Sequence, residues 1–218
     1  MGNAYEERLG TDRMLPLIFK MSLPAVAAQL VNIVDRIYIG HIPGIGTDAL
    51  AGIGVTSAII ILISSFSAIV GAGGSPLAAI ALGQGNRERA GQILGNGFIL
   101  LLIFTILTSA TTYLFMEPIL LFTGASENTI GYATDYLSIY LLGTLFVELS
   151  VGLNTFINTQ GRPTIAMYSV LIGAILNIGL DPLFIFTFGM GVKGAALATI
   201  LSQACSAIFP FSRRKKPH

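Results

Sequence analysis

The sequence predicts an all-α, polytopic membrane protein in which six transmembrane helices form one unit. Of its 218 residues, 53% are hydrophobic and only 11% are charged, whereas roughly 25% of the residues of a soluble domain carry charge. The mean hydropathy is +0.77. Since a spanning helix needs about 20 apolar residues, the chain is long enough for six such helices with short loops.

The positions of the helices follow from the apolar stretches. The second helix contains the glycine-rich segment GAGGSP (71–76). There the helix either tapers or lets a neighbouring helix approach closely. The longest loop has room for a small interfacial helix over 118–122. Residues 1–14 and 212–218 form tails outside the bundle at 15–211. The six predicted helices are 15–39, 50–76, 92–115, 132–156, 164–187 and 195–211.

The cations predict the orientation, because Lys and Arg are retained on the cytoplasmic side of a membrane. With the N-terminus inside, only Lys193 lies in an outer loop, and Arg36 lies near the outer end of the first helix. Both termini are therefore expected to be cytoplasmic. The inner segments hold ten of the twelve cations: Arg8, Arg13, Lys20, Arg87, Arg89, Arg162, Arg213, Arg214, Lys215 and Lys216.

Other classes of protein are disfavoured. A net charge of +1 does not supply the basic surface that nucleic-acid binding uses. The single cysteine, Cys205, leaves no internal disulfide, and His and Cys residues do not occur at zinc spacing. The G-x-G-x-x-G pattern of residues 189–194 joins two predicted membrane helices and indicates a tight turn. We expect no enzyme activity, no cofactor, no metal other than a coupling ion, and no nucleic-acid partner.

Three carboxylates lie clearly inside predicted spans, away from the first turn: Asp35, Glu148 and Asp181. Each needs a physical reason, because a charged side chain at the bilayer centre costs roughly 2.5 to 3.5 kcal/mol on insertion scales. At a rise of about 1.5 Å per residue, Asp35 lies roughly 6 Å and Asp181 roughly 9 Å below the outer ends of their helices. Thr199 lies at a similar depth, and Asn177 is one helical turn deeper than Asp181 on the same face. A polar cluster of four residues is therefore predicted in the outer half of the bundle.

Two carboxylates in one low-dielectric site cannot both stay ionised cheaply. Such a cluster can bind H⁺, and its other oxygens allow Na⁺ instead. In the alternative interpretation, Asp35 only reaches the outer interface, Asp181 makes a hydrogen bond between helices, and no ion is transported.

Two prolines are candidate hinges. Pro182 cannot donate to the carbonyl of residue 178, so the fifth helix should kink or loosen next to Asp181. Pro24 is a candidate bend below Asp35. Prolines are also frequent in membrane helices, where they can merely shape the packing.

Four further polar residues are candidates for lining a substrate cavity. Gln29 and Asn32 continue a polar stripe towards Asp35, or else they make hydrogen bonds between helices. Glu148 lies near the middle of the membrane with Asn154 nearer the inner end. Glu148 is either a second protonatable site for cationic ligands, a member of a buried pair, or a residue that faces water.

Three runs of sequence carry a family resemblance: NIVDRIYIG (32–40), NIGLDPLFIF (177–186) and GVKGAALAT (191–199). They closely resemble the amino-terminal half of multidrug and toxic compound extrusion (MATE) transporters. The resemblance implies export of amphipathic, often cationic drugs from the bacterial or archaeal cell, coupled to H⁺ or Na⁺ by alternating access in the plasma membrane. It also implies an amino-lobe cation site at the matching positions Asp35, Asn177, Asp181 and Thr199.

Members of that family are about twice as long and have two six-helix lobes. The resemblance therefore implies a complementary lobe, either a missing carboxyl-terminal half or a second copy of this chain. Two other interpretations stay open: a flippase for lipid-linked oligosaccharides, and a non-transporting membrane module that pairs with a partner protein.

Overall fold

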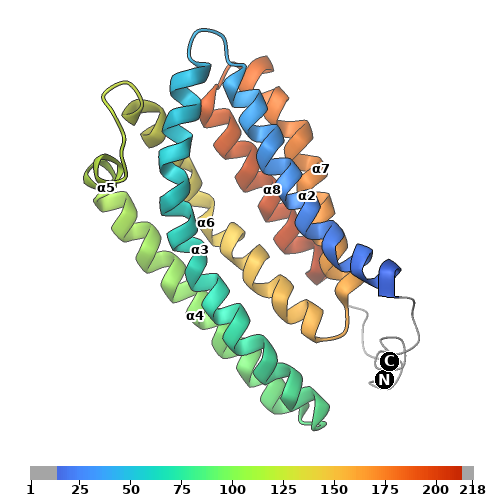
Figure 1. The fold of residues 1–218 in the computed structure, drawn as a ribbon. Coiled ribbons are helices and arrows are strands. Elements are labelled where there is room, and N and C mark those ends of the chain that lie inside the picture. The colour runs from blue at the N-terminus through green and yellow to red at the C-terminus, as the bar shows by residue number, and fades with distance from the viewer. Residues whose placement is uncertain (1–13, 213–218) are drawn as a thin grey trace.

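The computed structural model describes residues 14–212, so the predicted tails lie outside the described residues apart from Met14 and Ser212. Six long helices lie side by side in Figure 1, which confirms the predicted all-helical fold, and the described residues contain no strand. The long helices are α2 (Met14–Gly40), α3 (Gly46–Gly83), α4 (Arg87–Leu114), α6 (Ile130–Thr159), α7 (Pro163–Pro182) and α8 (Val192–Ser212).

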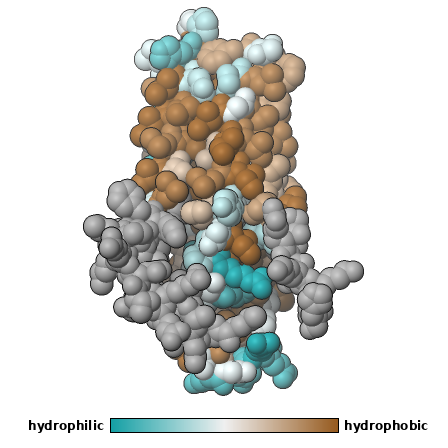
Figure 2. Space-filling model, turned by 90° about the vertical axis from the view of Figure 1, so that its right-hand side faces the viewer, coloured by the Kyte–Doolittle hydropathy of each residue, from teal (hydrophilic) through white to brown (hydrophobic). Residues whose placement is uncertain are grey.

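Five of these helices are long and apolar enough to cross a membrane, namely all except α2, whose side chains are described only in part. On the face shown in Figure 2, a broad band of hydrophobic residues lies between hydrophilic residues at the two ends. This is the surface expected of a polytopic membrane protein.

Helix α3 does not taper at its glycine-rich segment but continues through Pro76 to Gly83. A Cβ atom on Gly74 would lie 2.7 Å from Cζ of Phe156, and one on Gly71 would lie 3.1 Å from Oγ1 of Thr155. The glycines therefore allow α6 to approach closely. At 38 residues the helix is roughly 57 Å long, and with α4 it projects beyond the other helices (Figure 1).

The predicted interfacial helix is present as α5 (Met116–Phe122). Its Met116 and Leu120 side chains are buried in a cluster that includes Leu137 of α6 and Ile59 of α3. The short helix therefore anchors the long connection between α4 and α6 to the bundle.

The predicted loosening beside Asp181 takes the form of a π-helical turn. Helix α7 ends at Pro182 and is followed directly by η1 (Leu183–Thr187), in which Phe188 N donates to Leu183 O over 2.9 Å. Proline supplies no N–H to the preceding turn, which favours this change of geometry. The chain then reverses through Gly189 and Gly191, which have φ angles of 64° and 58°, as expected for a tight turn.

The helices that hold the predicted site pack around one interior. Helix α2 packs against α7, α7 packs against α8, and α8 packs against α6. The last helix thus brings Thr199 between the carboxylates of α2 and α7 and the inner face of α6.

Candidate functional site

The structure brings the four predicted cation-site residues together. Asp35 comes from α2, Asn177 and Asp181 come from α7, and Thr199 comes from α8. Asp35, Asn177 and Thr199 line a cavity of about 220 Å³ between α2, α6, α7 and α8. Asp181 lies beside it with none of its surface exposed.

The two carboxyl groups face each other. They are close enough for a single proton to bridge Asp35 and Asp181. Oδ1 of Asp35 and both oxygens of Asp181 are buried without a hydrogen-bond partner among the described residues. Ionised carboxylates have only acceptors, so the pair lacks a donor unless a proton or another cation lies between them.

Asn177 adds two more unpartnered atoms at the same place. Its side chain is 3% exposed, and both Oδ1 and Nδ2 are buried without a partner in the described structure. Together with the aspartates, five polar atoms on α2 and α7 are unsatisfied. Because buried polar atoms in native structures nearly always have partners, such a group points to a ligand site. The available oxygens suit a proton or a hard cation.

Tyr136 of α6 also belongs to this site, although no sequence pattern singled it out. Its hydroxyl interacts with the Thr199 hydroxyl and lies within electrostatic range of Asp35 and Asp181. The Thr199 hydroxyl itself donates to Ala195 O over 3.0 Å and can still accept a hydrogen bond. A buried tyrosine usually needs a partner for its hydroxyl, which is the signal that could have identified it.

The four predicted cavity residues separate into two groups. Asn32 and Asn154 line the cavity with Asp35, and Oδ1 of Asn154 is buried without a partner among the described residues. Gln29 is exposed and does not line it.

Glu148 does not line this cavity either, and its role in a substrate cavity stays a prediction. It is 1% exposed and accepts hydrogen bonds from Ser64 (2.9 Å) and Ser67 of α3. Six residues separate Glu148 from Asn154, so a helix with 3.6 residues per turn places them on different faces. The surroundings of Glu148 are therefore those of a buried group with hydrogen-bond partners.

A second cavity of about 100 Å³ lies towards the loop between α6 and α7. It is lined in part by Gln160 and Arg162, and it shares Ser150, Asn154 and Ser206 with the larger cavity. Polar side chains thus continue from the carboxylate pair towards the end of the bundle that carries Arg162.

The hinge roles of the prolines remain predictions. Pro182 is adjacent to Asp181 and directly precedes η1. Pro24 lies inside α2, but its side chain lies outside the described residues.

The comparisons with known proteins agree with this architecture. The MatE family model matches residues 16–183. The chain belongs to the MATE family. It is 33% identical over 195 residues to an FAD transporter of Shewanella oneidensis, covering 85% of this chain and 42% of that protein. It is 27% identical to the multidrug export protein MepA of Staphylococcus haemolyticus, covering 97% of this chain and 47% of MepA.

Solved MATE structures share the fold. A crystal structure of MATE in the bent conformation has a TM-score of 0.81 at 29% identity, covering 89% of this chain and 43% of that one. An outward-facing multidrug resistance MATE transporter has a TM-score of 0.82 at 27% identity, covering 91% and 44%. The chain is thus a multi-pass membrane protein of a family of transporters rather than enzymes, and it spans about half the length of the curated relatives it matches.

Proposed function

We propose that this chain is the six-helix lobe of a cation-coupled multidrug antiporter in which Asp35 and Asp181 bind the coupling ion. The observation that carries the proposal is the group of five buried, unpartnered polar atoms on α2 and α7. Asn177 and Thr199 supply the remaining oxygens. The coupling ion is H⁺ or Na⁺.

The electrostatics of the pair supply a driving force. Two unit charges about 4 Å apart repel by about 4 kcal/mol at an effective dielectric constant of about 20. That energy shifts a two-state equilibrium by roughly a thousandfold. Binding of a cation removes the repulsion and holds α2 against α7, whereas release favours their separation. Pro182 and η1 are the proposed hinge of α7, and Pro24 is that of α2.

The cavity favours a cationic, amphipathic drug as the exported substrate. Among the described residues, Asp35 is the only charged residue that lines it. Apolar side chains such as Val31, Val151 and Val170 line the remainder with Asn32 and Asn154. An anionic cargo such as FAD, named for the Shewanella relative, would lack a cationic partner there. A lipid-linked oligosaccharide carrying phosphate would lack one for the same reason.

We infer a second six-helix lobe that completes the cavity, because the chain spans about half the length of its relatives. That lobe is either a carboxyl-terminal half or a second copy of this chain. The proposed location is the bacterial or archaeal plasma membrane with both termini in the cytoplasm. The predicted spans support it, because they assign ten of the twelve cations to one side.

The experiment is ethidium export from proteoliposomes that contain the chain alone or with a second six-helix lobe, under an imposed H⁺ or Na⁺ gradient. We expect gradient-driven export in at least one arrangement and its loss to background in Asp35→Asn. Asp48→Asn is the matched control, because Asp48 is exposed in the first turn of α3 and does not line the cavity.

Export by Asp35→Asn at the rate of the unsubstituted chain would contradict the coupling role. Absence of export in both arrangements would favour the non-transporting module instead.

A further inference from the structure

Glu148 is a buried carboxyl group that the proposed transport cycle does not use. It lies midway along α6, a helix that spans the membrane, and 1% of its surface is exposed. The single ion pair found among the described residues joins Asp135 and Lys193, so no cation neutralises Glu148. A buried carboxylate without a cation is costly, which calls for a physical reason.

The partners of Glu148 are hydroxyl groups. Ser64 donates to its Oε1 over 2.9 Å and Ser67 donates to its Oε2. A hydroxyl can donate to an ionised carboxylate and can also accept from a protonated carboxyl. A lysine or arginine would hold the group ionised, and an apolar pocket would hold it neutral. Hydroxyl partners instead satisfy both protonation states.

The change between these states needs only a rotation of a serine hydroxyl. When Glu148 binds a proton, its carboxylate becomes a carboxylic acid whose O–H donates to one serine oxygen. That serine then donates to the carbonyl four residues earlier in α3. Ser65 of the same helix already makes such a bond, to Ile61 O over 2.7 Å.

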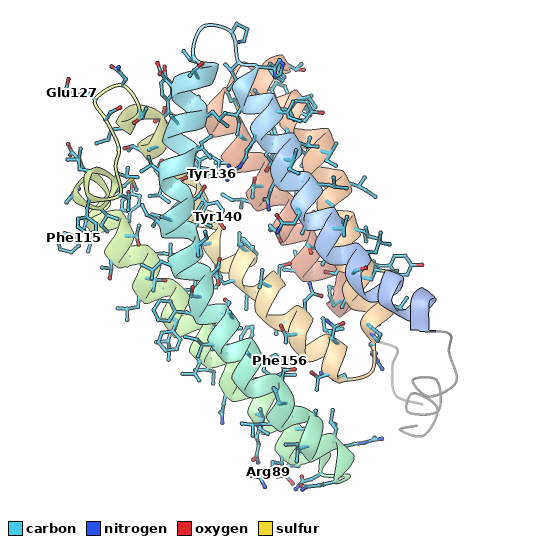
Figure 3. The ribbon with its side chains drawn as sticks, in the orientation of Figure 1. Arg89, Phe115, Glu127, Tyr136, Tyr140 and Phe156 are labelled. Atoms are coloured by element: carbon cyan, nitrogen blue, oxygen red, sulfur yellow. The ribbon has the colours of Figure 1, made fainter. Side chains whose placement is uncertain are left out.

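A line of buried residues on α6 connects Glu148 with the cation site. Tyr136, Tyr140, Thr144 and Glu148 recur every four residues and are all buried. The Tyr136 hydroxyl interacts with the Thr199 hydroxyl and lies within electrostatic range of the two aspartates. The rings of Tyr136 and Tyr140 are stacked with centroids 6.0 Å apart. The Tyr140 hydroxyl lies within electrostatic range of both Tyr136 and Glu148. Figure 3 shows both tyrosines on the upper part of α6.

We propose that the Glu148 carboxyl is a second proton-binding site of the lobe, separate from the Asp35–Asp181 pair. The two tyrosines, Tyr136 and Tyr140, couple the two sites, so a change of charge at the aspartates alters proton binding at Glu148. The proton site stands on the Glu148 geometry alone, whereas the coupling also rests on the proposed cation site.

The polar neighbours of the Glu148 carboxyl among the described residues are the hydroxyl groups of Ser64 and Ser67. From α6 itself, only the Tyr140 hydroxyl interacts with it. The remaining titratable residues on the described elements packed against α6 are Asp48 on α3, Arg87, Glu88, Arg89 and Tyr113 on α4, Glu117 on α5, Tyr168 and Asp181 on α7, and Lys193 and Cys205 on α8.

The test is infrared difference spectroscopy of the chain in lipid nanodiscs, titrated with pH, using the C=O stretch of protonated carboxyl groups. We expect a buried-carboxyl band that appears on acidification, shifts in D₂O and is lost in Glu148→Gln. Glu127→Gln is the control, because Glu127 is exposed (Figure 3) and its loss should leave this band intact. Ser67→Ala keeps the glutamate but removes one of its two hydroxyl partners, so the band should remain and its midpoint should differ from that of the unsubstituted chain.

Coupling is tested in the same spectra with Asp35→Asn. We expect this substitution to move the midpoint of the Glu148 band. The movement should be smaller when Tyr140→Phe is also present. It should be unchanged with Tyr132→Phe, which is the control. A Glu148 band that is absent or constant over the whole titration would overturn the proton site. An equal response with and without the Tyr140 hydroxyl would overturn the coupling. Neither result depends on drug export, so failure here is distinguishable from failure of the proposed antiport.

Discussion

Gly194 sits at the contact that holds Thr199 beside the carboxylate pair. A Cβ atom built on Gly194 would lie 2.7 Å from C of Phe184, 2.8 Å from its O and 3.0 Å from N of Ile185. These are backbone atoms of η1 and the turn around it, so a side-chain rotation cannot relieve the contact. Carbon atoms prefer separations of about 3.5 Å or more. Gly194→Ala must therefore move α8 from η1 by about 0.8 Å.

Overpacking of this kind costs typically about 1 to 3 kcal/mol. We expect Gly194→Ala to unfold with a free energy lower by that amount and to weaken the cation site, because Thr199 lies little more than one turn further along α8. The chain contains no tryptophan, so loss of helical circular dichroism during detergent or thermal unfolding is a suitable assay.

The control is Gly131→Ala. Gly131 also lies near the start of its helix, α6, but a Cβ atom there would meet nothing within 4 Å. The greater helix propensity of alanine should leave stability unchanged or raise it by up to about 1 kcal/mol. Equal stability of Gly194→Ala and Gly131→Ala would refute the close packing of α8 on η1.

Two further predictions concern other contacts of the bundle. The Ser206 hydroxyl of α8 lies 3.0 Å from the Ser150 hydroxyl of α6 and donates to Ser169 O of α7 over 2.9 Å. Ser206→Ala should therefore lower the free energy of unfolding by about 1 kcal/mol. An unchanged unfolding curve would count against this junction of three helices. The ion pair of Asp135 and Lys193 joins side chains that are 46% and 52% exposed. Asp135→Asn should therefore change the free energy of unfolding by no more than about 1 kcal/mol at low and high salt. A larger loss at low salt that disappears at high salt would contradict this small contribution.

Hydropathy predicted the helices because the bilayer imposes a length and an apolar composition on each of them. It did not locate the carboxyl-terminal end of α3, which runs seven residues beyond the predicted 76. Ala78 and Ala81 in that extension are buried, and burial against a neighbouring helix is a tertiary effect that a hydropathy profile does not contain.

Depth along a helix could be predicted from the sequence, whereas the faces that meet could not. The rise per residue predicted one level for Asp35, Asp181 and Thr199, and the structure places Asp35 and Thr199 on the wall of one cavity with Asp181 next to Asp35. The partners of Glu148 lie on α3, more than 80 residues earlier in the chain, so its position away from the cavity depended on which helices pack together. Tyr136 was missed because a tyrosine near the end of a membrane helix ordinarily indicates an interfacial anchor, while here it is buried beside Thr199.

The proton count of the aspartate pair tests most directly whether the two carboxyl groups act as one site. Proton uptake can be measured with a pH indicator in weakly buffered solution, on moving the purified chain from alkaline to neutral pH. Two carboxyls that share one proton predict that Asp35→Asn and Asp181→Asn each take up about one proton fewer than the unsubstituted chain, and that the double variant loses no more than either single variant. Two protons lost in the double variant, or no loss in either single variant, would contradict the shared site.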